Sequence, residues 1–256
     1  MNEKIVEIVK EASTLMLTDT FEVSQKEGYA NIVTSSDVAV QEFLRTKLSE
    51  FLPGSGFLCE EEDRHDLTHE YTWIIDPIDG TANYSRGIGQ CAICVGLRHN
   101  TKMVEAVVYL PRTNELFSAT KGGGAFLNGR QIHVSGRPFQ DAMLQTALSV
   151  YYKENAAVCS AIILDAFMQI NDIRRFGAAA PEICYVALGR CEMFFEYVLS
   201  PWDYAAASLI LQEAGGYLCD LDGNKPDCIS KTGLLAANSK ENLDRLLAIV
   251  KKHRKG

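Results

Sequence analysis

The sequence predicts a fold of mixed helices and strands, and three observations lead to this class. The first 18 residues place apolar side chains at helical spacing, with Glu and Lys between them. The middle of the chain holds short apolar or alternating runs bounded by turn residues, as strands do. The second half alternates such runs with longer helical patterns. With 256 residues, 47% of them apolar, the chain can bury a large core without disulfides.

The N-terminal half is expected to begin with two helices and to continue in strands. The first helix spans about 1–18, and a loop containing Lys26 leads to a second helix over about 37–50. Strands are then expected at 57–58, 73–75, 91–97, 103–110 and 115–120. The glycine-containing segments 122–124 and 128–129 predict hairpin turns between further strands.

The C-terminal half is expected to alternate between strands and helices. The expected elements are strand 143–150, helix 156–170, helix 181–188, strand 192–197, helix 202–214, strand 234–236 and a helix from 239. No low-complexity linker separates the halves. We divide the chain into 1–138, which carries most of the acidic motif residues, and 139–256. This division rests only on the change in the pattern of expected elements near 136–141.

Charge and composition make several partners and sites unexpected. The net charge is -8 and no basic run precedes the tail at 251–255, so nucleic acid is not an expected partner. The chain shows no signal-peptide core and no apolar run of membrane length, so we expect a cytoplasmic protein without membrane contact. Most of the eight cysteines lie in apolar runs, which favours reduced core thiols. Cys91 and Cys94 form a CxxC without a second pair, which disfavours a metal or redox role.

The most informative segment is WIIDPIDGTANY at residues 73–84. An apolar strand ends here in two acids, Asp76 and Asp79, and Gly80 allows a ligand to approach the backbone closely. Asp79 occupies the position expected of a helix N-cap. The amides of Gly80 and Thr81 are therefore expected to point outward and to form a phosphate-binding site. Carboxylates for a cation beside amides for an anion indicate metal-assisted phosphoryl chemistry.

Two further acids extend this pattern. Glu60 follows another apolar strand in FLCEE, and Asp203 lies at the start of an expected helix in PWDY. With Asp76 and Asp79 they would form an oxygen cage of the kind that Mg²⁺ prefers. Four carboxylates at one place repel each other unless cations neutralise them. The chain has neither a Walker-type loop nor a phosphatase-like cysteine loop, so metals would supply the positive charge that a phosphate ester needs.

Several separated motifs point to one family. DPIDGTANY lies between FLCEE and WDYAAASLILQEAGG, and VTSSD, GGGAFLNGR, RFGAAA and VALGRCEMFFE lie around them. Together these segments resemble the inositol monophosphatase family of Mg²⁺-dependent, lithium-sensitive sugar and polyol phosphatases, over nearly the whole chain. The resemblance implies an α+β fold, a layered αβαβα sandwich of the inositol monophosphatase and fructose-1,6-bisphosphatase type. Its metal site would lie between the two halves.

The resemblance also implies residue roles. The implied metal ligands are Glu60, Asp76, the Ile78 carbonyl, Asp79 and Asp203. Asp76 would bridge two Mg²⁺ ions, and Glu60 would help to hold a weaker third, so two or three ions are expected. The implied catalytic residues are Asp37, Glu60 and Thr81, with Asp37 orienting the Thr81 hydroxyl toward the attacking water. The implied substrate-binding residues are Gly80, Thr81, Ala179 and Glu196, and Lys26 is a candidate loop contact.

Some of these residues have a plainer structural alternative. Lys26 is either a loop lysine that contacts metal-bound water or phosphate, or an ordinary surface lysine. Glu196 is expected at the end of a strand that borders the metal cavity, where the family binds polyol hydroxyls. The alternative is a surface acid paired with Arg174 or Arg190. Arg174 and Arg175 either brace the pocket or flank a strand.

The predicted activity is hydrolysis of inositol-1-phosphate or a related polyol phosphate by a metal-activated water. Asn83, followed by an aromatic residue, is typical of the inositol phosphatases of the family. The alternatives are phosphatases for histidinol-phosphate, fructose-1,6-bisphosphate or nucleotide 3'-phosphate, and a non-catalytic regulatory relative. The intact set of acids argues against the last. Departures from the family pattern at Asn31, Cys59, Pro181 and Ala207 remove no ligand. The resemblance further implies inhibition by lithium and a homodimer.

Overall fold

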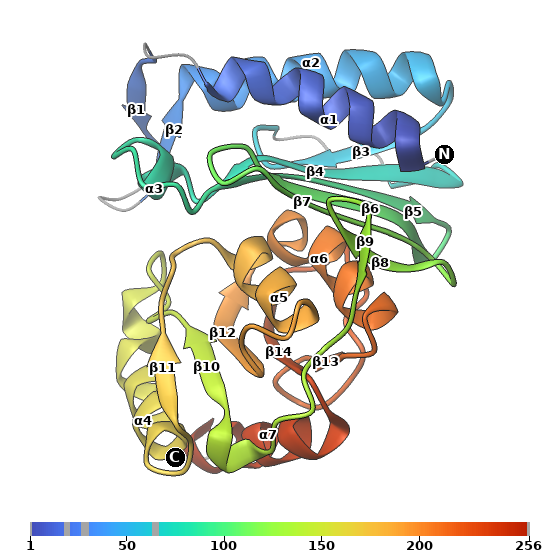
Figure 1. Ribbon diagram of the computed structural model, residues 1–256. Coiled ribbons are helices and arrows are strands. Elements are labelled where there is room, and N and C mark those ends of the chain that lie inside the picture. The colour runs from blue at the N-terminus through green and yellow to red at the C-terminus, as the bar shows by residue number, and fades with distance from the viewer. Residues whose placement is uncertain (1, 18–20, 27–30, 63–66, 255–256) are drawn as a thin grey trace.

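The computed structural model describes residues 2–17, 21–26, 31–62 and 67–254. The chain is built of five layers, in the order helices, sheet, helices, sheet, helices (Figure 1). One β layer is a seven-stranded sheet and the other a five-stranded sheet. The predicted α+β layered sandwich is thus confirmed.

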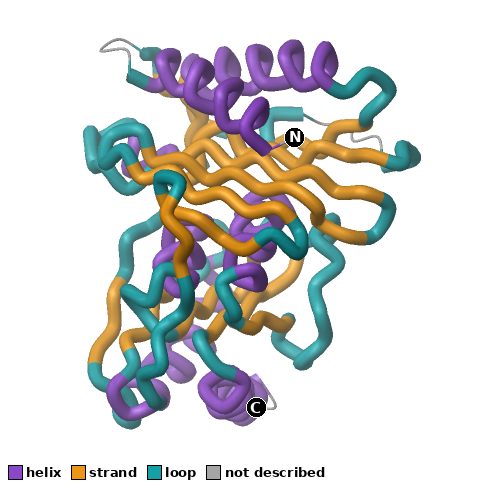
Figure 2. Tube along the Cα trace, turned by 45° about the vertical axis from the view of Figure 1, so that its right-hand side comes forward, coloured by secondary structure: helices purple, strands orange, loops and turns teal. Residues whose placement is uncertain are grey.

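Helices α1 (Asn2–Met16) and α2 (Ser35–Phe51) form the first layer and cover one face of the larger sheet (Figures 1 and 2). Their apolar stripes are buried against that sheet, where Val9 and Leu44 belong to the same core cluster as Trp73. A two-stranded ribbon, β1 (Val23–Gln25) and β2 (Ile32–Thr34), lies between the two helices in the chain.

The larger sheet contains seven strands in chain order. They are β3 (Gly56–Cys59), β4 (Tyr71–Asp79), β5 (Ala92–His99), β6 (Lys102–Leu110), β7 (Glu115–Thr120), β8 (Gly124–Leu127) and β9 (Arg130–Ile132). β3 runs parallel to β4, whereas the pairs from β4 to β9 are antiparallel. The short helix α3 (Thr81–Tyr84) follows β4 directly.

Helices α5 (Ala179–Ala187) and α6 (Pro201–Glu213) fill the space between the two sheets (Figure 1). All nine residues of α5 are buried, as expected of a helix that is covered on every side. Val108 of the larger sheet and Phe194 of the smaller one pack in the same core cluster as these helices.

The smaller sheet has the strand order β11, β10, β12, β14, β13. Its strands are β10 (Met143–Thr146), β11 (Asp172–Arg174), β12 (Met193–Leu199), β13 (Tyr217–Cys219) and β14 (Thr232–Ala237). β10 is parallel to both β11 and β12, so these three strands end at the same edge of the sheet. Helices α4 (Ala156–Phe167) and α7 (Lys240–Arg254) cover its outer face (Figure 1).

Some predicted boundaries are wrong. α5 begins two residues before Pro181, because proline is tolerated in the first turn of a helix. The strand predicted over 143–150 ends at Thr146, and Ser149 then adopts a positive φ of 52°. α4 ends at Phe167 rather than near residue 170. The division at 138 and 139 stays a prediction.

The cysteine prediction is confirmed: all eight are free and buried. In the described part of the chain, none of the helices is both long enough and apolar enough to cross a membrane.

Candidate active site

The acids of two motifs meet because β3 and β4 are parallel neighbours. Cys59 pairs with Ile75 at the ends of these strands, and the Glu60 amide donates to the Ile75 carbonyl at 3.2 Å. Glu60 therefore lies beside Asp76, and the two carboxyl groups come within hydrogen-bond reach of each other. Parallel strands end at the same edge of a sheet, so acids far apart in sequence come together there.

β4 continues past Asp76 in an irregular form. Its register against β5 shifts between Asp76 and Asp79. The Ile78 amide donates to Asp76 Oδ1 at 3.0 Å, which fixes the carboxylate next to the turn. The Ile78 carbonyl accepts from the Thr81 hydroxyl at 2.9 Å, and both residues line the cavity described below.

The predicted helix cap at Asp79 is wrong. Asp79 is the last residue of β4, and Gly80 precedes α3 with a φ of 86°. A Cβ at Gly80 would lie 2.9 Å from the Ala178 side chain, so a larger residue would meet both strain and a clash. The Asp79 carboxylate accepts instead from the amides of Ala179 and Ala180, at 3.3 and 2.6 Å. It thereby joins β4 to the start of α5.

Asp37 is buried in the first turn of α2 and reaches the site through Thr81. Thr34 and Asp37 form a capping box in which the Thr34 amide and hydroxyl donate to Asp37 Oδ2 at 2.7 and 2.5 Å. Asp37 Oδ1 lies 3.1 Å from the Thr81 hydroxyl, which can donate to it. Burial raises the pKa of Asp37, whereas hydrogen bonds from Thr34 and Thr81 lower it. This arrangement orients the Thr81 hydroxyl.

Asp203 enters the site from the start of α6. It forms a capping box with Ser200, whose amide donates to Asp203 Oδ2 at 2.7 Å. Because α5 begins beside Asp79, two helices begin beside the acids, and the positive ends of their dipoles favour negative charge there.

Burial raises the pKa of each of the four acids, and repulsion from neighbouring acids adds to this for Glu60, Asp76 and Asp203. Burial is the main cause of a pKa of about 7 for Glu60 and of about 6 for Asp79. The pKa values of Asp76 and Asp203 are raised further, by burial and then by the neighbouring acids. Lys26 offers partial compensation, since its Nζ lies 3.5 Å from Glu60 Oε1 and also pairs with Glu61.

Magnesium fits this set of donors. Among the described residues, no three Asp, Glu, His or Cys side chains form a ready metal-binding cluster. The chemistry of the donors nevertheless suits a hard divalent cation, because carboxylates and one carbonyl face a cavity that has room for water ligands. A cation would also relieve the repulsion that raises the pKa values of these acids.

The predicted residues converge on one cavity with a volume of about 710 Å³. It is lined by Lys26, Glu60, Asp76, Ile78, Asp79, Gly80, Thr81, Ala179, Glu196 and Asp203. Asp37 is not among the lining residues and lies behind Thr81. Two other motif residues, Ala82 and Asn83, line it as well.

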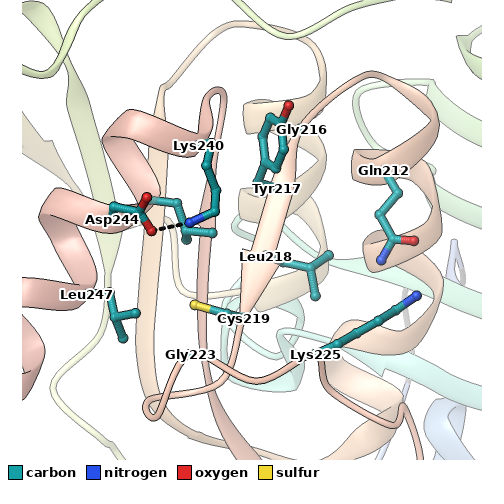
Figure 3. A pocket seen from close by; sticks show the side chains of 11 residues that line it. Gln212, Gly216, Tyr217, Leu218, Cys219, Gly223, Lys225, Lys240, Asp244 and Leu247 are labelled. Atoms are coloured by element: carbon teal, nitrogen blue, oxygen red, sulfur yellow. Dashed lines mark hydrogen bonds and ion pairs between the residues drawn. The ribbon is translucent and has the colours of Figure 1, made fainter.

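A second cavity, with a volume of about 350 Å³, lies between β13 and α7 (Figure 3). It contains none of the predicted site residues, and its carboxylate, Asp244, pairs with Lys240. The larger cavity is therefore the candidate active site.

Comparison with known proteins decides the family. A sequence model described as the inositol monophosphatase family matches residues 2–255. The chain belongs to the inositol monophosphatase family. A putative Nus factor SuhB of Neisseria meningitidis serogroup B is 37% identical over 232 residues, which cover 90% of this chain and 88% of that protein. An inositol-1-monophosphatase of Mesorhizobium japonicum is 35% identical over 231 residues, which cover 88% and 85%.

A solved structure shows the same fold. The extragenic suppressor protein suhB from Bartonella henselae is 32% identical and superposes with a TM-score of 0.91, covering 98% of both chains. An IMPase from Thermotoga maritima is 27% identical, with a TM-score of 0.86 over 98% of this chain and 96% of that one. The predicted membership of the inositol monophosphatase family is thus confirmed.

Glu196 lies on the cavity wall of this family member rather than in a surface ion pair. Its two proposed partners are used elsewhere, because Arg174 pairs with Asp172 and Arg190 pairs with Glu115. The pKa of Glu196 is raised to about 8, mainly by burial and also by the nearby acids Glu182 and Asp79, while Arg175 opposes the shift.

Other lining residues were not predicted from the sequence. They are Arg86, Ile88, Gln90, Ala147, Tyr151, Tyr152, Glu182 and Lys231, among others. Ala147, Tyr151, Tyr152 and Lys231 lie far from the motifs in sequence, whereas Arg86, Ile88 and Gln90 follow DPIDGTANY and Glu182 follows RFGAAA. Of the two neighbouring arginines, Arg175 lines the cavity, whereas Arg174 pairs with Asp172.

Proposed function

We propose that this chain hydrolyses a phosphate monoester, inositol-1-phosphate or a related polyol phosphate, by a Mg²⁺-dependent mechanism. One observation carries the proposal: the Thr81 hydroxyl lies between Asp37 and the Ile78 carbonyl, in the cavity that four acids surround. Membership of the inositol monophosphatase family supports a phosphatase.

The acids would hold the cations. Glu60, Asp76 and the Ile78 carbonyl would hold a first Mg²⁺, and Asp76, Asp79 and Asp203 a second. Glu60 would help to hold a weaker third ion. Bound Mg²⁺ lowers the pKa of water and stabilises the entering and leaving oxygens of an in-line displacement.

The remaining residues would position the reactants. The Thr81 hydroxyl carries one proton, which it can donate to Asp37 or to the Ile78 carbonyl. When that proton goes to Asp37, a lone pair of Thr81 is free to accept from the attacking water. The amides of Gly80 and Thr81 would hold the phosphate, and Lys26 would contact it from the loop after β1.

The polyol end of the substrate would lie against Glu196 and Ala179. Replacing Glu196 with Gln is expected to weaken inositol-1-phosphate turnover by about 1–3 kcal/mol in transition-state free energy, because Gln offers the polyol hydroxyls one acceptor oxygen where Glu offers two. Turnover of p-nitrophenyl phosphate, which has no hydroxyls to bind, should be spared. Values of kcat/KM for both substrates check this, and equal losses on both would assign Glu196 a structural role instead.

Fewer contacts support the choice of a polyol substrate than support metal-dependent hydrolysis. The Asn83 side chain donates to the carbonyls of Gln90 and Phe176 at 2.8 and 2.7 Å, so its amide holds the structure together. Both amide protons of Asn83 are therefore used within the protein, and its Oδ1 is the atom that could accept from a polyol hydroxyl. A panel of inositol-1-phosphate, histidinol-phosphate, fructose-1,6-bisphosphate and a nucleotide 3'-phosphate, scored by phosphate release with Mg²⁺, tests the proposal. A marked preference for inositol-1-phosphate is the expected result.

The names of the relatives keep one alternative open. Some are named Nus factor SuhB, and others inositol-1-monophosphatase. A regulatory role without catalysis would give no phosphate release from any compound in the panel. Inhibition by lithium, a homodimer and a cytoplasmic location stay predictions for this chain.

A further inference from the structure

Gln90 lines the active cavity, and one end of its side-chain amide is unused. Its Oε1 lies 3.1 Å from the Tyr185 hydroxyl, whereas no residue that the structure describes accepts a hydrogen bond from its Nε2. Gln90 is half-buried, but Nε2 is not one of the buried polar atoms that lack a partner, so this nitrogen is open to solvent. Gln90 therefore offers two N–H groups to a ligand in the cavity.

The backbone of Gln90 lies directly beside Gly80. A Cβ at Gly80 would lie 2.9 Å from the Gln90 carbonyl oxygen, and Asn83 donates to the same oxygen at 2.8 Å. Two residues further along the chain, Ala92 pairs with Asp79. The Gln90 side chain thus starts from a fixed position next to Gly80, whose amide is proposed to hold the phosphate.

Tyr185, a residue of α5, decides how the Gln90 amide is turned. Its hydroxyl carries one proton and lies 3.1 Å from both Gln90 Oε1 and Glu115 Oε2. Burial, and then the charge of Glu115, raise the pKa of Tyr185 to about 12, so the hydroxyl keeps this proton at neutral pH. Glu115 already accepts from Arg190 and Thr113 through its two oxygens. It therefore stays paired when the Tyr185 proton goes to Gln90, and Gln90 Nε2 then faces away from Tyr185.

The ring of Tyr185 is itself held on two sides. The guanidinium carbon of Arg190 lies 4.8 Å from the ring centroid. The ring of Phe176 meets it edge-on, with the two centroids 5.6 Å apart. The group that orients Gln90 is thus rigid before any ligand binds, and an amide that is already oriented loses less entropy on binding.

The surroundings of Gln90 favour an uncharged hydroxyl group as its partner. The Asn83 amide donates to the carbonyls of both Gln90 and Phe176, so the apolar Phe176 lies close to Gln90 on the cavity wall. Ile88, two residues before Gln90, is a further apolar lining residue. A charged group would lose hydration here that a neutral amide does not replace, whereas a hydroxyl would lose less.

We propose that Gln90 is a specificity-determining residue that donates from Nε2 to a hydroxyl group of the substrate near the phosphate ester. Tyr185 is then the positioning residue that turns the Gln90 amide toward this hydroxyl. The inference rests on the proposed phosphatase function and deepens it, because it names the residue that distinguishes a polyol phosphate from a phosphate ester without hydroxyls.

The test replaces Gln90 with Met, which has a similar length and shape but no amide. Phosphate release with Mg²⁺ gives kcat/KM for inositol-1-phosphate and for p-nitrophenyl phosphate, which has no hydroxyl group. Gln90→Met should lower kcat/KM for inositol-1-phosphate by about tenfold, because one hydrogen bond is lost and the substrate hydroxyl is left unpaired. p-Nitrophenyl phosphate should change by less than about twofold. Gln212→Met, in the second cavity, is the matched control and should change neither substrate.

A double-mutant cycle tests the role of Tyr185. Tyr185→Phe keeps the ring and its contacts, and it should lower kcat/KM for inositol-1-phosphate by about threefold. If Tyr185 acts through Gln90, adding Tyr185→Phe to Gln90→Met should cause no further loss. Losses that add in the double variant would give Tyr185 a separate, structural role.

Equal losses of Gln90→Met on the two substrates, or no loss on inositol-1-phosphate, would overturn the role of Gln90. If the wild type hydrolyses neither substrate, the proposed function itself fails. Calorimetry of inositol-1-phosphate with wild type, Gln90→Met and Gln212→Met then still decides. Weaker binding by Gln90→Met alone supports the contact, and equal binding by the three proteins, or no binding by the wild type, rejects it.

Discussion

Replacing Asp76 with Asn is expected to lower the turnover of a polyol phosphate by about 1,000-fold or more, which corresponds to about 4 kcal/mol. Asp76 is the ligand that both proposed Mg²⁺ ions share, so its loss disturbs both. Asn keeps the shape and one oxygen acceptor, and the Ile78 amide can still donate to it. Measuring kcat by phosphate release at saturating Mg²⁺ checks the prediction.

The same variant should remain folded. Burial and three neighbouring acids raise the pKa of Asp76, so the ionised side chain is disfavoured in the folded protein without a cation. Its thermal midpoint in chelator should therefore equal or exceed that of the wild type. Asp244→Asn, outside the active cavity, serves as the control and should keep full activity. A folded Asp76→Asn protein with near wild-type turnover would show that Asp76 bridges no catalytic metal.

Replacing Thr81 with Val is expected to lower kcat by about 100-fold, because a positioned group that assists proton transfer is lost. Val has nearly the same shape as Thr but cannot donate to Asp37 or accept from water. KM should change little, since the backbone amide proposed to hold the phosphate remains. Steady-state kinetics on inositol-1-phosphate separates the two parameters.

Thr81→Ser supplies the control for this variant. Ser keeps the hydroxyl within reach of Asp37, and its turnover should lie within about tenfold of the wild type. If Ser and Val lose activity equally, the Thr81 methyl group matters for packing and its hydroxyl has no catalytic role.

The elements that the sequence predicted best are those with long patterns. The helices α1, α2 and α7 bury one face, and the longer strands of the larger sheet bury one face or both, so their patterns are visible in sequence. β1, β11 and β13 contain three residues each and were not predicted. So short a strand has too few residues to show a period, and only its neighbours in the sheet define it.

The site residues also fall into two groups, those that local sequence patterns predicted and those that only the tertiary structure brings to the cavity. The acids and Thr81 lie within a few residues of each other or within recognisable motifs, so their type and spacing indicated a metal site. The role of Asp79 as a helix cap was mispredicted, because the amides of Ala179 and Ala180, about 100 residues away, compete for its carboxylate. Arg175 and Lys231 reach the cavity only because of the strand order in the smaller sheet. Strand order is a tertiary property that no local pattern shows.

The central claim is that the acids around Asp76 hold Mg²⁺ for the hydrolysis of a phosphate monoester. The most direct measurement is phosphate release from inositol-1-phosphate by protein dialysed against chelator and then titrated with Mg²⁺. The predicted result is no release without the cation and a saturable return of activity as Mg²⁺ is added. Full activity in chelator, or no activity at any Mg²⁺ concentration, would contradict the claim.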